Sequence, residues 1–308
     1  MILRYAHLSR HSKVFEAMTG LRLTEFDELL DDVLPRYAEA EVKRLSRPQR
    51  VRAIGGGHPF ELSPRDQILL TVVWLRVYPI HEVLGFLFDV SDSSVSRYIS
   101  TVLPMLEASG RDTMRLPDPG RKHRRQLDDL LKEIPDLAVV IDSFEQRVQR
   151  PRSRAEADTY YSGKKKQHTL KSQVTIDLAT GDIVDISESV RGPTADVRLL
   201  EQSGVLSRLP PGVAGLGDLA YIGIAALHPQ GLGFTPRRKP RGQARPAEDV
   251  AYNTAFSRVR IGVEHTIGQM RRYQSLTQTD RNHRRQHAPR VVAVAGLVNR
   301  KRCRHRPR

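Results

Sequence analysis

The chain has 308 residues, and its 50 Lys and Arg outnumber its 35 Asp and Glu, which gives a formal net charge of +15. A hydrophobic content of 39% excludes wholesale disorder, no run of 18 apolar residues could span a bilayer, and a single Cys303 excludes a disulfide framework or a cysteine zinc site. We therefore expect a cytoplasmic protein with no membrane contact and a polyanionic partner, most simply nucleic acid. The alternatives are a basic surface that only aids solubility and a compositional bias towards Arg.

The positive charge lies in blocks. The last segment, Arg281–Arg308, holds ten Lys or Arg and no acid, whereas residues 25–41 are acidic. Further basic blocks lie at residues 121–125, 147–154, 164–166 and 237–245. A merely solvated surface mixes its charges more evenly, so this segregation favours contacts with a phosphate backbone.

The first part of the chain is predicted to be helical. Residues 20–50 form an acidic amphipathic helix, and residues 47–59, with three consecutive glycines, form a loop. Ser63 is placed to cap a largely apolar helix that begins at Pro64 and ends before Pro79.

Two short helices follow, at about Ile80–Phe88 and Asp92–Leu103, with a tight break between them. The second has an apolar stripe at helical spacing, formed by Val95, Ile99 and Val102. We expect small hydroxyl side chains and one cation to face outward, namely Ser93, Ser94, Ser96, Arg97 and Ser100. This pattern favours a helix-turn-helix whose second helix enters the major groove, and an ordinary helical hairpin is the alternative.

After a linker, the pattern changes to that of a mixed α/β domain. We expect a strand at Leu137–Ile141, a hairpin formed by His168–Ile176 and Asp182–Val190, and strands at residues 212–217 and 232–235. Helices are predicted at residues 194–202 and 251–273. The apolar stripe of the long last helix consists of Tyr252, Phe256, Val259, Val263, Ile267 and Met270.

Three acids of this second part could converge. Asp142 and Asp218 each follow a predicted strand, and ligand sites gather at the carboxyl ends of strands. Glu264 borders the apolar stripe of the long helix, between Arg260 and Arg271. Three carboxylates around one point suit Mg²⁺, and two such ions can drive phosphoryl transfer. The alternatives are that the two aspartates are caps or turn residues and that Glu264 pairs with Arg260.

Other chemistries lack a matching motif. The sequence contains no GxxxxGK[ST] phosphate loop and no GxGxxG dinucleotide fingerprint. It also contains no HExxH zinc motif and no GxSxG nucleophile elbow. The acidic residues therefore remain the main candidates for catalysis.

Several stretches occur together in the order of a known family. Residues 62–276 resemble the DDE transposases of bacterial insertion sequences, of the insertion-sequence-five type related to the eukaryotic Harbinger elements. The resemblance is carried by the helix-turn-helix at Leu62–Ile99, by YYSGKKKQHTLKSQV at Tyr160–Val174, and by RGPTADVRLLEQSG, LGDLAYIG and RVRIGVEHTIGQMRRY.

The resemblance implies an α/β fold, with a ribonuclease-H-like mixed-sheet catalytic domain preceded by an all-α helix-turn-helix domain. It places the catalytic, metal-binding acids at Asp142, Asp218 and Glu264, and makes Asp196 a supporting residue. The family pattern Arg-x3-Glu-x6-Lys becomes Arg260, Glu264 and Arg271 here, so these arginines are also supporting candidates. The implied parts are a helical DNA-binding domain at 1–115 with the helix-turn-helix at about 63–103, a linker at 116–135, the catalytic domain at 136–280 and a basic C-terminal helix and tail at 281–308.

The implied activity is transposition. Such a protein would bind the terminal inverted repeats of its element, and would cleave and join DNA with two Mg²⁺, for which Mn²⁺ could substitute. The expected DNA contacts are Ser93, Ser94, Ser96, Arg97, Lys164, Lys165 and Lys166. The protein would work in the bacterial cytoplasm at the nucleoid, as a homodimer or higher oligomer on transposon ends and target DNA.

The sequence departs from the family at three places beside the acids. Ser143-Phe144 replaces the usual Gly-Thr after the first acid, Ala195 replaces a His, and Ala220 replaces a Gly before Tyr221. The carboxylates remain in place. Two other functions therefore stay open, namely a catalytically inactive or domesticated DNA-binding regulator, and a ribonuclease-H-like nuclease that cleaves without joining.

Overall fold

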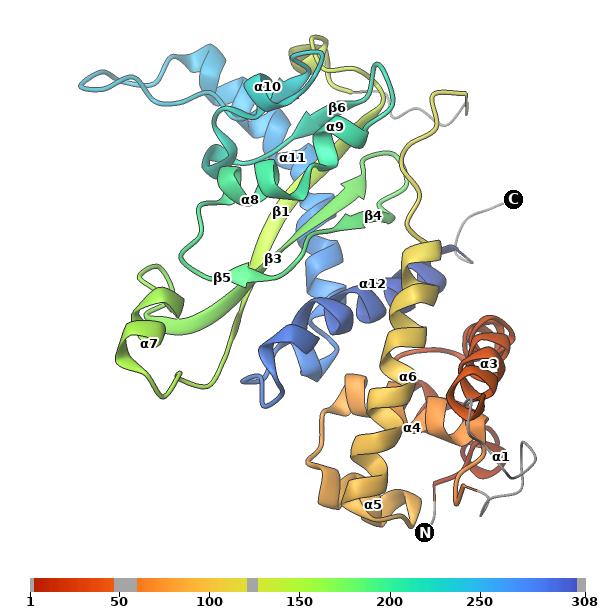
Figure 1. Cartoon of the computed structure of the whole chain (residues 1–308). Coiled ribbons are helices and arrows are strands. Elements are labelled where there is room, and N and C mark those ends of the chain that lie inside the picture. The colour runs from red at the N-terminus through yellow and green to blue at the C-terminus, as the bar shows by residue number, and fades with distance from the viewer. Residues whose placement is uncertain (1–2, 47–59, 121–126, 304–308) are drawn as a thin grey trace. The chain divides into compact units, whose positions relative to one another are not determined.

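The computed structural model describes residues 3–46, 60–120 and 127–303 (Figure 1). The chain divides into two compact units. The first contains the described residues as far as Thr113, together with Arg272–Gln278 and the chain from Val292 onward. The second contains Met114–Arg271 and Thr279–Val291. Within the described ranges, no helix is long and apolar enough to cross a membrane.

Helices are the regular elements of the first unit, as far as its residues are described. Its elements are α1 (Tyr5–Leu8), α2 (Ser12–Thr19), α3 (Leu23–Leu45), α4 (Pro64–Val77), α5 (His81–Phe88), α6 (Asp92–Asp112), the 3-10 turn η3 (Gln274–Leu276) and the C-terminal part of α12 (His287–Cys303). The predicted helix over residues 20–50 is confirmed from Leu23 to Leu45. The loop predicted at residues 47–59 lies outside the described residues.

Helix α4 is the centre of this unit. Ser63 caps it by accepting a hydrogen bond from the Asp66 backbone amide, and Pro64 occupies its first position, as predicted. Nine consecutive residues, Gln67–Leu75, are buried, since α2, α3 and α6 pack around the helix. Tyr78 ends the helix in a left-handed conformation, with φ at 56°.

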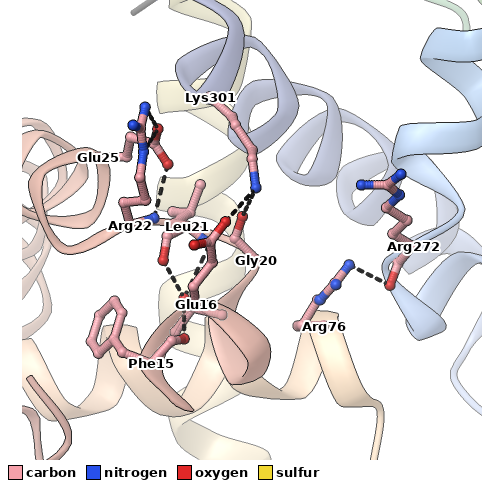
Figure 2. Close-up of polar contacts among 10 residues, drawn as sticks. Phe15, Glu16, Gly20, Leu21, Arg22, Glu25, Arg76, Arg272 and Lys301 are labelled. Carbon is pink, nitrogen blue, oxygen red and sulfur yellow. Dashed lines mark hydrogen bonds and ion pairs between the residues drawn. The ribbon is translucent and has the colours of Figure 1, made fainter. Parts of the chain in front are cut away.

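The C-terminal helix completes this helical core. A Cβ built on Gly296 of α12 would lie 2.3 Å from the Gly110 Cα of α6, so the two helices cross at backbone contact. Lys301 donates to Glu16 Oε1 at 2.8 Å and to the Gly20 carbonyl at 3.3 Å (Figure 2). The last helix is therefore a structural part of the N-terminal unit.

The segment Arg272–Gln278 packs into the same core. The Arg76 guanidinium donates to the Arg272 carbonyl at 2.6 Å (Figure 2) and lies 5.3 Å from the ring centre of Tyr273. Tyr273 is buried beside Gly20, where a Cβ would come within 2.7 Å of the phenol oxygen. Burial raises the pKa of Tyr273, so this phenol stays neutral.

The second unit is built on a mixed sheet. Its strands are β1 (Ala138–Arg147), β2 (Tyr161–Ser162), β3 (Gln167–Asp177), β4 (Ile183–Ile186), β5 (Val190–Arg191), β6 (Ala214–Leu216) and β7 (Gly233–Phe234). Their order is β2-β3-β1-β6-β7, with β4 and β5 also paired to β3. β1 runs antiparallel to β3 and parallel to β6, and the predicted β3–β4 hairpin is confirmed.

Helices cover both faces of this sheet. They are α7 (Arg154–Tyr160), α8 (Asp196–Ser203), α9 (Val205–Arg208), α10 (Ile224–Leu227) and α11 (Ala247–Met270), with 3-10 turns η1 (Asp129–Leu131), η2 (Leu219–Tyr221) and η4 (Arg284–Gln286). Val139 and Ile141 of β1 join a core with residues of α8, α9 and α10. Helix α11 packs on β1 and β3 and buries all six residues of its predicted apolar stripe.

Candidate active site and nucleic-acid interface

Strand β1 places Asp142 within the sheet. The sequence predicts that Asp142 ends a strand at Ile141, and this is wrong, because β1 continues to Arg147 with its backbone paired to β3. Successive side chains point to opposite faces of a strand. Ile141 and Ser143 face α8 to α10, whereas Asp142 faces α11, where it meets Arg260.

Asp142 is electrostatically coupled to both other predicted acids. Burial raises its pKa, and the negative charges of Asp218 and Glu264 raise it further. Two contacts oppose this effect. The Ser143 backbone amide donates to Asp142 Oδ1 at 2.8 Å, and Arg260 Nη2 lies 3.5 Å from Oδ2. The charges of a turn residue and of a helix residue therefore both reach the carboxylate on the strand.

Asp218 follows β6, the parallel neighbour of β1. Its side chain accepts from the Ala220 amide at 2.8 Å and so caps the turn η2, which is the structural role kept open for it. A cap uses one carboxylate oxygen in this way. The other oxygen is not needed for the cap, and the charge of Asp218 still reaches Asp142.

Glu264 lies exposed on α11, in a groove of about 440 Å³ that Arg245 and Arg258 also line. Across the described residues, no ion pair joins Glu264 to Arg260, so the predicted local salt bridge is not formed. Arg260 turns to Asp142 instead. Its Nε is buried and has no hydrogen-bond partner within the described chain, which leaves one guanidinium donor available for a ligand oxygen.

The donor chemistry of the three acids fits a hard divalent cation. Carboxylate oxygens are the ligands that Mg²⁺ prefers, and a cation would offset both the burial of Asp142 and the nearby negative charges that raise its pKa. However, among the described residues no three His, Cys, Asp or Glu side chains are gathered closely enough to enclose an ion. The structure thus supplies carboxylates of the type that binds Mg²⁺, and two of them influence the charge of Asp142. It does not hold the three close enough together to surround an ion.

Asp196 is joined through Ser143 to the strand that carries Asp142. Asp142, Asp218 and Glu264 are called the acid cluster from here on. The Ser143 hydroxyl donates to Asp196 Oδ1 at 2.6 Å, and Lys171 Nζ lies 3.0 Å from the same oxygen. Lys171 is buried on β3 and also donates to the Thr194 carbonyl at 2.6 Å. The sequence missed Lys171. Ser143 was signalled only as a departure from the family pattern, although it makes the link between Asp142 and Asp196.

Tyr221 is a second residue that sequence reasoning left without a role. It is buried at the end of η2, where its hydroxyl lies beside the Ser143 side chain. Burial raises its pKa well above the usual value, and the charges of Asp196, Asp142 and Asp218 add to this effect. A neutral phenol is therefore held near three carboxylates, where its hydroxyl can donate to a carboxylate or to a ligand oxygen.

The predicted DNA-binding lysines lie away from the acids. Lys164, Lys165 and Lys166 are exposed in the turn between β2 and β3. Asp142 is paired in register with Val174, eight residues further along β3, which corresponds to roughly 26 Å at the usual rise of a strand. The structure does not bring these lysines to the acid cluster. Arg271, by contrast, lies 5.9 Å from the ring centre of Phe144, on the same strand as Asp142.

Helices α5 and α6 form the predicted pair. Ser91 caps α6 by accepting from the Ser94 amide, and Ser93, Ser96 and Arg97 are exposed. The outward orientation predicted for Ser94 is wrong. Ser94 is buried, and its hydroxyl accepts from Arg97 at 3.0 Å, because α4 and α5 both pack against α6 and cover more than its apolar stripe.

These two units match one protein family in sequence. A model of DDE superfamily endonucleases matches residues 141–299, and a model of the helix-turn-helix of DDE superfamily endonucleases matches residues 60–112. The chain therefore belongs to the DDE superfamily of transposases, with an N-terminal helix-turn-helix followed by a ribonuclease-H-like mixed sheet. The helix-turn-helix implies DNA binding, and endonucleases of this superfamily typically depend on a divalent metal.

One curated relative covers nearly the whole chain. The probable transposase for insertion sequence element IS702 of Microchaete diplosiphon is 29% identical over 290 residues, which are 94% of this chain and 94% of that protein. The family resemblance and the fold class expected from the sequence are thereby confirmed.

Proposed function

We propose that this protein is the transposase of an insertion sequence, which cleaves DNA at the ends of its element and transfers the freed strands to target DNA. The observation that carries this proposal is that the three acids come from elements in contact, in a chain of the DDE endonuclease family: Asp142 lies in β1, Asp218 follows its parallel neighbour β6, and Glu264 lies in α11, which packs on β1. The charges of Asp218 and Glu264 add to burial in raising the pKa of Asp142. Carboxylates that repel one another in a basic chain are the expected setting for cation-dependent phosphoryl transfer.

Asp142, Asp218 and Glu264 would hold the divalent cation, as two Mg²⁺ or their Mn²⁺ substitutes. Lewis-acid polarisation of the scissile phosphodiester would come from that cation when bound. Arg260 positions Asp142 and offers its buried Nε to a phosphate oxygen. Asp196, through Ser143, and Arg271, against Phe144, support the strand that carries Asp142.

The reaction has two phosphoryl transfers. In the first, the oxygen of water bonds to phosphorus at the element's end and the bond from phosphorus to the 3′ oxygen breaks; one water proton passes to solvent, and the leaving 3′ oxygen takes up the other through solvent to become a hydroxyl. In the second, that 3′ hydroxyl bonds to phosphorus of a target phosphodiester and gives up its proton to solvent, and the target's own 3′ oxygen leaves and takes up a proton. One set of carboxylates serves both steps because the attacking and leaving oxygens exchange places.

The expected DNA contacts come from exposed residues of both units. The exposed Ser93, Ser96 and Arg97 of α6 would read the terminal inverted repeats, and the exposed lysines at 164–166 would contact phosphates elsewhere on the DNA. Joining two ends requires at least two copies of the chain. We place the protein at the nucleoid in the bacterial cytoplasm.

The test compares DNA nicking by the wild type and by Glu264→Gln with Mg²⁺ or Mn²⁺, on DNA that carries the element's ends. We expect the variant to lose nicking by at least about 100-fold, since it loses one anionic oxygen ligand. The matched control is Glu248→Gln, because Glu248 is exposed on the same helix. Equal nicking by wild type and Glu264→Gln would contradict the assignment.

A DNA-binding regulator without catalysis is the second candidate. It is favoured by the acids that are not gathered into a closed metal shell and by the unusual Ser143 beside Asp142. Binding to the element's ends without metal-dependent cleavage would establish it. Cleavage without joining would instead favour a ribonuclease-H-like nuclease. Inverted repeats flanking the gene would support the transposase.

A further inference from the structure

A groove of about 710 Å³ opens in the second unit between the end of α7, strand β5 and the start of α8, which Figure 1 labels. This volume is in the range of pockets that hold small ligands. The lining residues are Tyr160, Leu170, Ser189, Val190, Arg191, Pro193, Thr194, Ala195, Arg198 and Gln202. Two of these residues are arginines and none is an acid.

The two arginines are available to a ligand. Arg191 and Arg198 are exposed, and neither makes an ion pair with a described residue. Arg191 instead lies 5.4 Å from the ring centre of Tyr160, and Arg284 lies 4.5 Å from the same ring. Both guanidinium groups lie over this ring, so a flat ligand would stack on the layer of guanidinium and tyrosine rather than on the bare ring, and the positive charge favours an anionic ligand.

The groove is joined to the acid cluster by fixed contacts. Thr194 and Ala195 line it and lead directly into Asp196. Lys171 contacts both the Thr194 carbonyl and the Asp196 carboxylate, and Ser143, the residue beside Asp142, donates a hydrogen bond to Asp196. A ligand in the groove therefore lies next to the network that supports the first acid.

We propose that this groove binds unpaired nucleotides of one DNA strand next to the Asp196–Ser143 contacts, with phosphates on Arg191 and Arg198 and a base stacked near Tyr160. Free phosphate would satisfy the arginines but would use neither the ring nor the length of the groove. A protein acid would lack the stacking surface. The inference rests on the proposed function, since it names the form of DNA that the catalytic unit takes.

The experiment uses the full chain and two fluorescent DNA probes, a blunt duplex and the same duplex with a ten-nucleotide oligothymidine tail. Fluorescence anisotropy gives the affinity for each probe without metal, so no cleavage is required. We expect the wild type to prefer the tailed probe by at least about 10-fold, since stacking of one base contributes about 1–3 kcal/mol. The double variant Arg191→Ala/Arg198→Ala should lose that preference and bind the blunt duplex as before.

The control is Arg10→Ala, which removes an exposed arginine from the other unit and should leave the preference intact. A tail of abasic sites separates charge from stacking. The wild type should bind the abasic tail more weakly than the thymidine tail, and Tyr160→Leu should bind the two tails alike. An unchanged preference in the arginine double variant, or an equal loss on both probes, would overturn the proposal.

Failure of the proposed function has a different signature. A chain that never nicks DNA with Mg²⁺ but keeps the tail preference would retain the groove as a nucleotide site while refuting the transposase. A chain that nicks DNA and shows no tail preference would support the transposase and refute the groove as a nucleotide site.

Discussion

His287 is a buried imidazole whose two nitrogens are both used. Its Nδ1 lies 2.6 Å from Ser189 Oγ, and its Nε2 lies 2.9 Å from Gln146 Oε1. The amide oxygen can only accept, so Nε2 carries the proton and Nδ1 accepts from the serine hydroxyl. Burial lowers the pKa of His287 to about 3, and the Arg290 charge lowers it as well, while Asp280 opposes the shift.

Because of His287, we expect the folded protein to become less stable as the pH falls. Between the unfolded pKa of 6.5 and the folded pKa of about 3, the unfolded chain binds a proton that the folded chain rejects. The free energy of unfolding should therefore fall by about 2 kcal/mol from His287 between about pH 8 and pH 5. Urea unfolding at both pH values measures this difference. His287→Gln should show a smaller fall, and an identical fall in wild type and variant would rule out His287 as the cause.

Two glycines determine how closely two helices of the first unit approach. A Cβ on Gly110 would come within 2.7 Å of the Val292 carbonyl oxygen, and one on Gly296 within 2.3 Å of the Gly110 Cα. Such contacts cannot be relieved by rotating a side chain, because the neighbouring atoms are backbone. The crossing of α6 and α12 therefore depends on the absence of side chains at both positions.

Substitution at this crossing should be costly. We expect Gly296→Ala to lower the free energy of unfolding by about 1–3 kcal/mol, because the helices must separate. The matched control is Gly268→Ala in α11, where no atom lies within 4 Å of the new methyl group. That control should leave stability unchanged or raise it by up to about 1 kcal/mol. Chemical denaturation of the two variants decides, and equal stabilities would argue against the close crossing.

The order of elements was largely predictable, because the spacing of apolar residues along the sequence matches the face that each strand or helix buries. The stripe of α11 is an example, since all six of its residues are buried. Strand β1 was predicted too short, because its second half is polar and is held by backbone pairing to β3, which leaves no apolar pattern. Ser94 was misplaced for a similar reason, since its burial depends on α4 and α5.

The acid cluster was predictable only in part. Residue type and position relative to the strands singled out Asp142, Asp218 and Glu264, and the charges of the last two reach Asp142. Their roles in catalysis stay a prediction. Lys171 and Tyr221 could not be found in the same way, because a buried lysine on a strand and a tyrosine in a turn have no distinctive spacing. Their surroundings come from segments distant in sequence.

At the scale of the whole molecule, the basic C-terminal segment is partly neutralised by ion pairs. In the described part of this segment, which ends at residue 303, four basic side chains pair with acids, in the pairs Arg284–Glu156, Arg290–Asp280, Arg300–Asp32 and Lys301–Glu16. Net charge along the sequence showed the excess but not these partners, since Arg300 and Asp32 are 268 positions apart. The positive charge of this segment therefore serves partly to hold the fold together, and only the remaining basic residues are candidates for DNA contacts.

A substitution of Arg300 tests whether these ion pairs stabilise the fold. Its guanidinium binds Asp32 and donates to Ser109 Oγ at 2.7 Å. We expect Arg300→Met to lower the free energy of unfolding by about 1–3 kcal/mol, because Asp32 loses a charged partner. The salt dependence of DNA binding should stay the same, since this guanidinium is already engaged. A slope of log affinity against log salt that falls by about 0.9 would show instead that Arg300 contacts a phosphate.

The use of α12 in the first unit also sets an order of events during synthesis. Thr113 and Val292 belong to the same helical core, yet 178 residues separate them along the chain. At about 5–20 residues per second, translation needs roughly 9–36 s to cover that distance. The helix-turn-helix thus leaves the ribosome well before the helix that completes its core. A nascent or prematurely terminated chain would lack a finished DNA-binding unit, so competence to bind DNA would arise only after the catalytic unit has been made.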